Sequence, residues 1–147
     1  MLWVTRRTIR VNRTATAWLI KRFIDPRATF LFVAPEEVVL AQERDGAVGF
    51  DAPGATYPHQ DDRGRCSFEA LAEERCADDP ALRELARIVH GADLPDEHPA
   101  SESAGLRAIS HGFPLVANHD QAVVEQATFL YDALYASLRE RLTEGKR

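Results

Sequence analysis

The sequence has 147 residues, of which 45% are hydrophobic and 28% are charged, and its formal net charge is -5. This length suffices for a single domain over residues 1–147 whose core needs no disulfide or structural metal, and no apolar run approaches the length of a membrane span. The N-terminus lacks the long apolar core of a signal peptide. We therefore expect a cytoplasmic protein with reduced cysteines, and its acidic balance does not favour nucleic-acid binding by this chain alone.

Strand and helix patterns alternate in the first part of the chain. The predicted elements are a strand at 2–5, a helix at 15–24, a strand at 29–33, a helix at 35–44, and short strands at 47–51 and 55–59. Asn12 or Thr14 is expected to cap the first helix, and Asp25-Pro26 to end it.

Helical patterns dominate the remainder. The predicted elements are a helix at 67–74 capped by Ser67, a helix from Pro80 that ends near Gly91, an exposed loop at 94–101, a helix at 104–111 and a long helix at 119–142. The whole pattern predicts an α+β domain, or α/β as the alternative, with a small mixed sheet of three or four strands and about five helices.

The segment from Tyr57 to Glu69 is rich in side chains that bind metal ions. His59, Cys66 and Glu69 offer an imidazole nitrogen, a thiolate and a carboxylate, and Asp93 follows a later helix. We predict a divalent metal site for Zn, Mn or Fe with His59, Glu69 and Asp93 as ligands. The structural alternative is that His59 is a loop residue and that Glu69 complements the dipole of the helix it begins.

Two further residues are candidates to enlarge this site. Cys66 is a soft ligand or a redox-active thiol, because the following helix would lower its pKa, although buried packing is the commoner fate of a cysteine. His90 stands near Asp93 and has a structural alternative as a cation near a helix C-terminus. The other histidines, His98, His111 and His119, form no helical metal motif with one another.

The front of the chain is cationic although the whole chain is acidic. Residues 1–27 contain seven of the 18 basic residues and one of the 23 acidic residues. Arg13 and Arg22 lie at the start and in the body of the first predicted helix, where they could face a ligand pocket at the edge of the sheet. We predict that they bind a small oxyanion, with solvated or internally paired arginines as the alternative.

Several segments in order resemble the C-terminal domain of ChrB-type chromate-resistance proteins. These segments are Trp3-Val4-Thr5-Arg6, Asn12-Arg13-Thr14-Ala15, Trp18 to Pro26, Phe30 to Val33, Cys66-Ser67-Phe68-Glu69, Ile88 to Asp93 and Leu130 to Tyr135. The resemblance spans nearly the whole chain and implies a stand-alone domain of the chromate-resistance type.

The resemblance implies two functions that the sequence does not separate. One is a metal-dependent domain that handles or reduces an oxyanion such as chromate, and the other is a sensor or partner-binding regulatory module without catalysis. Both would use the same metal and oxyanion sites. No membrane partner is expected.

Overall fold

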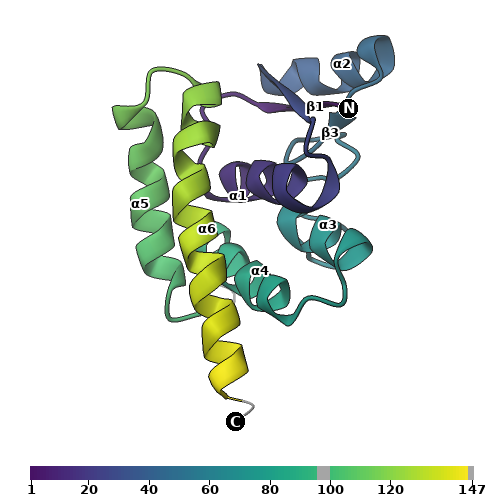
Figure 1. Ribbon diagram of the computed structural model, residues 1–147. Coiled ribbons are helices and arrows are strands. Elements are labelled where there is room, and N and C mark those ends of the chain that lie inside the picture. Colours follow the sequence, from purple (N-terminus) through teal and green to yellow (C-terminus); the bar gives the residue numbers. More distant parts are fainter. Residues whose placement is uncertain (96–99, 146–147) are drawn as a thin grey trace.

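The computed structural model describes residues 1–95 and 100–145. Within these ranges, the chain forms six α-helices, one π-helical and one 3₁₀ segment, and three strands (Figure 1). In chain order, the elements are β1 (Leu2–Arg6), α1 (Val11–Leu19), η1 (Ile20–Ile24), β2 (Thr29–Val33), η2 (Pro35–Glu37), α2 (Val38–Asp45), β3 (Val48–Gly49), α3 (Ser67–Arg75), α4 (Pro80–Asp93), α5 (Ser103–Val116) and α6 (Asp120–Glu144). The α+β prediction is confirmed.

The sheet has the order β2-β1-β3 with β1 in the centre. Both pairings are parallel, with Trp3 opposite Phe30 and Val4 opposite Gly49, so the prediction of a mixed sheet is wrong for the described strands. The strands are parallel because a helical crossover follows each of β1 and β2 and returns the chain in the same direction. The strand predicted at 55–59 is reduced to a single bridge between Tyr57 and Phe50.

The first helix begins at Val11, four residues before the prediction, and continues through Leu19 as a π-helical turn to Ile24. Neither Asn12 nor Thr14 caps it, because both side chains make contacts with other helices. Asn12 Oδ1 accepts from the Phe68 amide at 3.3 Å, and the Thr14 hydroxyl lies 2.7 Å from that of Tyr131. Arg10 occupies the N-cap position without a capping side-chain bond.

Two later helices run past their predicted ends. Helix α4 includes Gly91 and ends at Asp93, and α5 includes both Gly112 and Pro114. Glycine lowers helix stability without forbidding a helix, and a proline removes one amide donor that neighbouring turns can compensate. Cys66, rather than the predicted Ser67, is the N-cap of α3, where it forms a capping box with Glu69.

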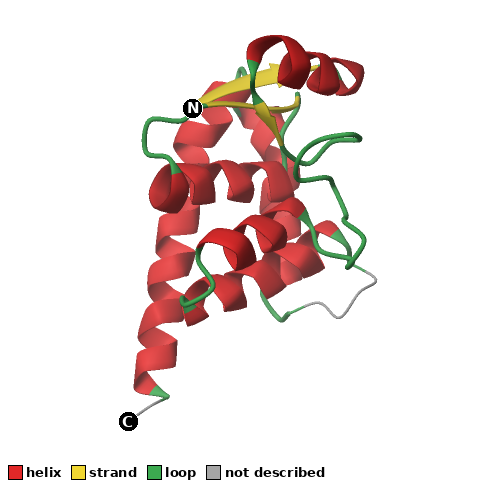
Figure 2. Cartoon of the chain, turned by 90° about the vertical axis from the view of Figure 1, so that its right-hand side faces the viewer, coloured by secondary structure: helices red, strands yellow, loops and turns green. Residues whose placement is uncertain are grey.

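The sheet lies at one end of the molecule, and the larger helices lie beneath it (Figure 2). Helix α2 covers one face of the sheet through a small apolar cluster that includes Val4 and Val38, both fully buried. The main core joins the other face to α1, α3, α4 and α6, with Phe68, Leu85 and Tyr131 fully buried within it. No helix in the described ranges has the length and apolar character to cross a membrane.

The end of β1, the start of α1 and the segment after β3 lie close together below the sheet. Arg6 ends β1, the loop after it leads into α1, and Asp51 follows β3 by two residues. Ligands of open parallel sheets bind beyond the carboxyl ends of the strands. The fold therefore brings the start of α1 and the residues that follow β3 to the position where a ligand is expected.

Candidate functional site

Three side chains with metal-binding atoms meet where the start of α3 contacts the end of α4. The Cys66 Sγ, a Glu69 carboxylate oxygen and a His90 ring nitrogen all lie within 4.8 Å of one another. Cys66 is fully buried, whereas Glu69 and His90 are partly exposed. The cluster combines sulfur, oxygen and nitrogen donors at one point that solvent reaches from one side.

Local hydrogen bonds hold this cluster in place. Glu69 Oε1 accepts from the Cys66 amide at 2.9 Å and also pairs with His90 Nδ1. Burial, followed by the Glu69 carboxylate, raises the pKa of the Cys66 thiol. The lowering of this pKa expected from the helix start does not occur, because burial and the nearby carboxylate outweigh it. The neighbouring Arg65 pairs with Asp61 and Glu73.

A second group of charged side chains surrounds Asp51, which follows β3. Asp51 Oδ1 lies 2.6 Å from His59 Nδ1 and 3.3 Å from Arg6 Nη2, and its Oδ2 lies 3.5 Å from Arg13 Nη1. The Asp51 side chain is only 3% exposed, and the residue adopts a φ of 52°, which non-glycine residues seldom do. One buried carboxylate thus orients two arginines and a histidine.

Asp93 lies beside this group at the end of α4. Its Oδ2 is 3.6 Å from His59 Nδ1 and has no hydrogen-bond partner in the described part of the chain. Burial, followed by the nearby Asp51 carboxylate, raises the pKa of Asp93 to about 6, although His59, Arg13 and Arg6 act in the opposite direction. The hydrogen bond from His59 to Asp51 in turn raises the pKa of His59.

The structure divides the predicted metal ligands between two neighbouring sites. His59 and Asp93 lie together, whereas Glu69 lies with Cys66 and His90, the two residues considered as additional ligands. The Asp93 charge also contributes to the raised pKa of Cys66, so the two sites interact electrostatically.

The two predicted anion-binding arginines have different surroundings. Arg13 lines a pocket of about 720 Å³ together with Arg6, Arg10, Arg107, His59 and Asp93. Arg22 lies outside this pocket, because its guanidinium pairs with Asp132 at 2.6 Å and Trp18 bonds the same carboxylate. Arg22 thus fastens η1 to α6.

Sequence reasoning missed Asp51, Arg6, Arg10 and Arg107 as parts of this pocket. One sequence signal pointed to Asp51, because it ends the strand predicted at 47–51 and precedes the Pro53-Gly54 turn, a position typical of ligand-binding residues in parallel sheets. No sequence signal pointed to Arg107, because it lies on α5, more than 90 residues after Arg13.

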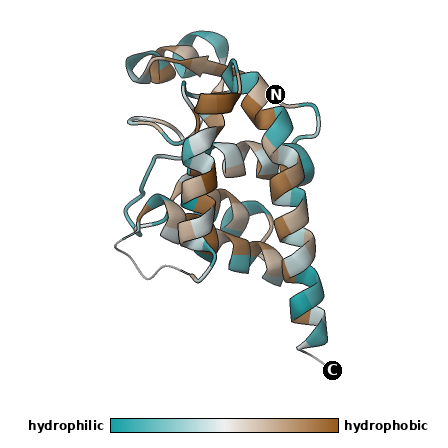
Figure 3. Cartoon of the chain, turned by 90° about the vertical axis from the view of Figure 1, so that its left-hand side faces the viewer, coloured by the Kyte–Doolittle hydropathy of each residue, from teal (hydrophilic) through white to brown (hydrophobic). Residues whose placement is uncertain are grey.

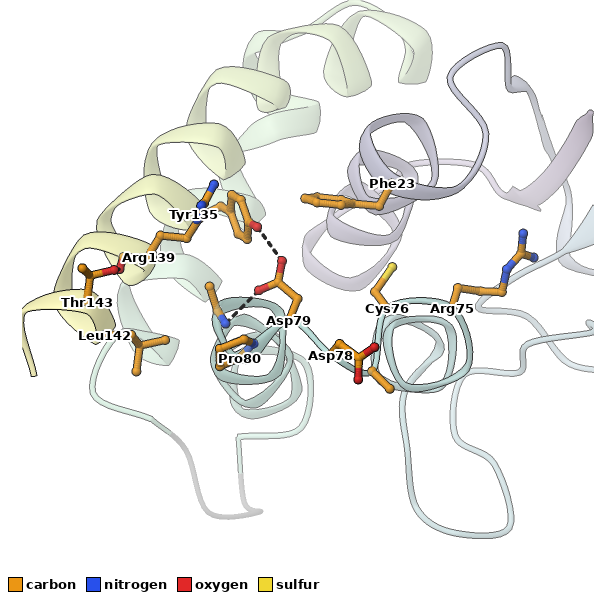
Figure 4. A pocket seen from close by; sticks show the side chains of 12 residues that line it. Phe23, Arg75, Cys76, Asp78, Asp79, Pro80, Tyr135, Arg139, Leu142 and Thr143 are labelled. Carbon is orange, nitrogen blue, oxygen red and sulfur yellow. Dashed lines mark hydrogen bonds between the residues drawn. The ribbon is translucent and has the colours of Figure 1, made fainter. Parts of the chain in front are cut away.

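The remaining histidines and Cys76 have other surroundings. His111 lines the arginine pocket, His119 accepts from the Ala122 amide at the start of α6, and His98 lies outside the described residues. Cys76 lines a separate pocket of about 590 Å³ near the start of α4 (Figure 4). There Asp79 caps α4 and accepts from Tyr135 at 2.5 Å, and burial raises the pKa of Tyr135 to about 12.

We predict that replacing Asp93 with Asn stabilises the protein more at pH 7.5 than at pH 4. A carboxyl group whose pKa rises on folding costs stability as pH increases between its unfolded and folded pKa values. The Asp93 side chain is 15% exposed and has a pKa of about 6 in the fold. Its ionisation should therefore lower the free energy of unfolding by about 2–3 kcal/mol over this interval. Urea denaturation of both proteins at the two pH values measures the difference.

The Asp62→Asn variant serves as the control, because the Asp62 side chain is exposed and forms no hydrogen bond or ion pair with the described residues. Its stability relative to wild type should not change with pH by more than about 0.5 kcal/mol. An Asp93→Asn profile parallel to that of wild type would show that Asp93 ionises normally in the fold.

The fold and these sites define the class of protein: an α+β domain with an arginine-rich pocket and an adjacent cluster of metal-binding atoms below a small parallel sheet. Comparison with known sequences identifies the family. The model of the family described as "ChrB, C-terminal domain" matches residues 3–138. The chain therefore belongs to the ChrB C-terminal domain family, and the predicted resemblance to this family is confirmed.

One curated relative extends this comparison. Protein ChrB of Cupriavidus metallidurans (strain ATCC 43123 / DSM 2839 / NBRC 102507 / CH34) is 40% identical over 134 residues, which are 90% of this chain and 39% of that protein. The chain thus spans about two fifths of the length of this relative. No solved structure shows a significant match to the chain.

Proposed function

We propose that this chromate-resistance domain binds one divalent metal ion through Cys66, Glu69 and His90, next to a pocket that receives an oxyanion. The observation that carries the proposal is the grouping of these three ligand atoms within 4.8 Å. Three protein ligands leave a coordination position open for water or a substrate, as in catalytic rather than structural metal sites. The site would thus support metal-assisted chemistry on the oxyanion.

The donor set limits the metal. A thiolate and an imidazole suit zinc or iron, whereas manganese prefers sites made of oxygen ligands. Of the three metals considered from the sequence, zinc and iron(II) fit the cluster. Cys66 and Glu69 come from one turn of α3 and His90 from α4, so a bound metal would join two helices that already pack together.

The arginine pocket supports the oxyanion part of the proposal. Arg13 and Asp93 are among its lining residues, and His90 of the cluster lies three residues before Asp93 on α4. Chromate is a dianion, and arginine presents paired donors suited to such groups. An anion in the pocket would therefore lie next to the proposed metal.

A second candidate function is a sensor without catalysis. The residues that line the pocket come from β1, α1, α4 and α5 and from the segment that contains Asp51 and His59. A ligand held by all of them would restrict the movement of these elements relative to one another, and such ordering can transmit a signal.

Metal analysis tests the proposal directly. Protein equilibrated with zinc or iron(II) and then desalted should retain about one ion per chain, and Cys66→Ser and Glu69→Gln should each weaken binding at least about tenfold. Serine with glutamate, and cysteine with glutamine, preserve the capping box of α3, so both variants keep the fold. With cobalt, the wild type should show a thiolate charge-transfer absorption that Cys66→Ser lacks.

His59→Gln distinguishes the structural ligand set from the one predicted by sequence. Our proposal expects this variant to bind metal as the wild type does, and His90→Gln to lose it. Loss with His59→Gln but not with His90→Gln would instead support the set of His59, Glu69 and Asp93. Equal metal content in all variants would refute the site.

Two measurements separate catalysis from sensing. Chromate incubated with a thiol reductant and the metal-loaded protein should be consumed faster than with metal-free protein if the domain is catalytic. Saturable heat on titration with chromate, without such acceleration, would favour the sensor.

A further inference from the structure

The arginine pocket has an anion-binding feature beyond its side chains, namely the start of helix α1. Arg10, Val11, Asn12 and Arg13 all line the pocket, and they form the N-cap and first turn of this nine-residue helix. No side chain among the described residues caps the helix, and its first turn contains no acidic residue. The first amides of a helix lack internal partners and carry partial positive charge, so they bind anions well.

Buried polar atoms at the same place also lack partners. Asn12 is only 2% exposed, and its Nδ2 forms no hydrogen bond within the described residues. Arg13 Nε is buried and unpaired as well, although the other nitrogens of this guanidinium contact Asp51 and the Thr8 carbonyl. Buried donors without partners are rare in folded proteins. Two of them beside an uncapped helix start indicate a missing acceptor.

The balance of charge around the pocket is positive. Four arginines and two aspartates line it, and Asp51 already contacts two of these arginines. Arg10 forms no side-chain hydrogen bond or ion pair in the described ranges. Arg107 donates from Nη1 to the Ala92 carbonyl at 2.8 Å, which directs its guanidinium across the end of α4. These two arginines keep donors for a ligand.

The pocket is much larger than an inorganic oxyanion. Its volume is about 720 Å³, within the roughly 300–1,000 Å³ range of sites for small organic molecules. A five-atom oxyanion would occupy on the order of 100 Å³, or about three water volumes. Val11, Ala104 and Ala108 add small apolar side chains to the wall. These apolar side chains favour contact with the carbon atoms of a ligand over contact with water.

We propose that the pocket binds a phosphorylated small organic molecule, with its phosphate at the start of α1 and its organic body along α5. This inference rests on the oxyanion part of the proposed function and does not require the metal. The phosphate group of a phosphate monoester is a tetrahedral dianion, as chromate is. Arg10, Arg13 and Asn12 would hold the phosphate, while Ala104 and Ala108 leave room for the body.

Calorimetric titration with AMP, adenosine and inorganic phosphate tests the proposal. AMP should bind at least about tenfold more tightly than phosphate, because it gains apolar contacts in addition to the phosphate contacts, and adenosine should show no saturable binding. Arg10→Gln should weaken both AMP and phosphate by about five- to tenfold. Arg10 is exposed and has no side-chain partner within residues 1–95 and 100–145, so this variant keeps the fold.

Ala108→Leu distinguishes contacts with the organic part of the ligand from contacts with its phosphate. A larger side chain at this exposed position of α5 should weaken AMP at least about fivefold and leave phosphate binding unchanged. Arg27→Gln and Ala136→Leu are matched controls, since both positions are exposed and lie outside the pocket. Neither should alter any of the three titrations.

The outcome is independent of the metal test. Protein treated with EDTA should bind AMP as the metal-loaded protein does, so a failed metal site leaves this result intact. AMP that binds no more tightly than phosphate, or an equal effect of Ala108→Leu on both ligands, would overturn the proposal. Absence of binding by both anions would do so as well.

Discussion

Asp51→Asn is expected to destabilise the protein by about 3 kcal/mol, a large fraction of the stability of a domain. The Asp51 side chain is 3% exposed and contacts Arg6, Arg13 and His59, so the substitution leaves three partly buried basic groups without their counter-charge. Removal of one partner from a buried ion pair costs far more than removal of an exposed one. Chemical denaturation at pH 7.5 measures the loss.

The same variant should change the titration of His59. The hydrogen bond that His59 donates to Asp51 is the main cause that raises the His59 pKa, whereas burial lowers it, so the pKa should fall in Asp51→Asn. A raised histidine pKa adds stability that is present at low pH and is lost as pH rises through the folded pKa. The stability difference between wild type and variant should therefore widen from pH 8.5 to pH 6. NMR titration of the His59 ring reports the pKa itself.

Asp62→Asn again provides a surface control, with an expected change within about 0.5 kcal/mol. If Asp51→Asn cost no more than this control, or if the His59 pKa did not fall, Asp51 would not organise the pocket. Such a result would also remove the basis for placing the arginines around a preformed anion site.

The local part of the fold could be predicted because it depends on short-range patterns. The apolar run from Thr29 to Val33 and the 3.6-residue repeat of α6 each indicate one type of element, and both were found near their predicted bounds. The end of α5 could not be predicted. Gly112 and Pro114 are typical of helix ends, yet the helix continues because Phe113 packs against the main core.

The candidate site depends on contacts that sequence does not encode locally. Glu69 had two histidine partners available, His59 before it and His90 after it. Which one approaches Glu69 depends on how α4 packs against α3, and that packing is determined by core residues such as Leu85 and Phe68. His90 and Asp93 are three residues apart on α4, but His90 meets Glu69 while Asp93 meets His59. The C-terminal end of α4 therefore contributes one residue to each of the two sites.

Several large hydrophobic side chains of α5 and α6 are exposed at the surface. Phe129, on α6, is 81% exposed, and Leu115 and Val116, at the end of α5, are 75% and 81% exposed. Both helices carry hydrophobic residues along their length in Figure 3. The periodicity of α6 identified its buried face, but it assigned no role to an aromatic residue on the opposite face.

Phe68→Ala and Phe129→Ala form a matched pair in which the same atoms are removed from the core and from the surface. Phe68 is fully buried in α3, between the two proposed ligands Cys66 and Glu69, and its amide donates to Asn12 of α1. Its truncation should cost about 3–5 kcal/mol and lower Tm by roughly 10 °C. Phe129→Ala should change stability by no more than about 0.5 kcal/mol, because alanine favours helix and little burial is lost.

Thermal and urea unfolding measure this pair, and metal binding by the folded fraction adds a functional reading. Because Phe68 fixes the turn that presents Cys66 and Glu69, its loss should also weaken metal binding, whereas Phe129→Ala should leave metal binding unchanged. A small cost for Phe68→Ala would mean that α3 is not anchored through the core. A cost for Phe129→Ala similar to that for Phe68→Ala would mean that its ring is buried in solution against another surface.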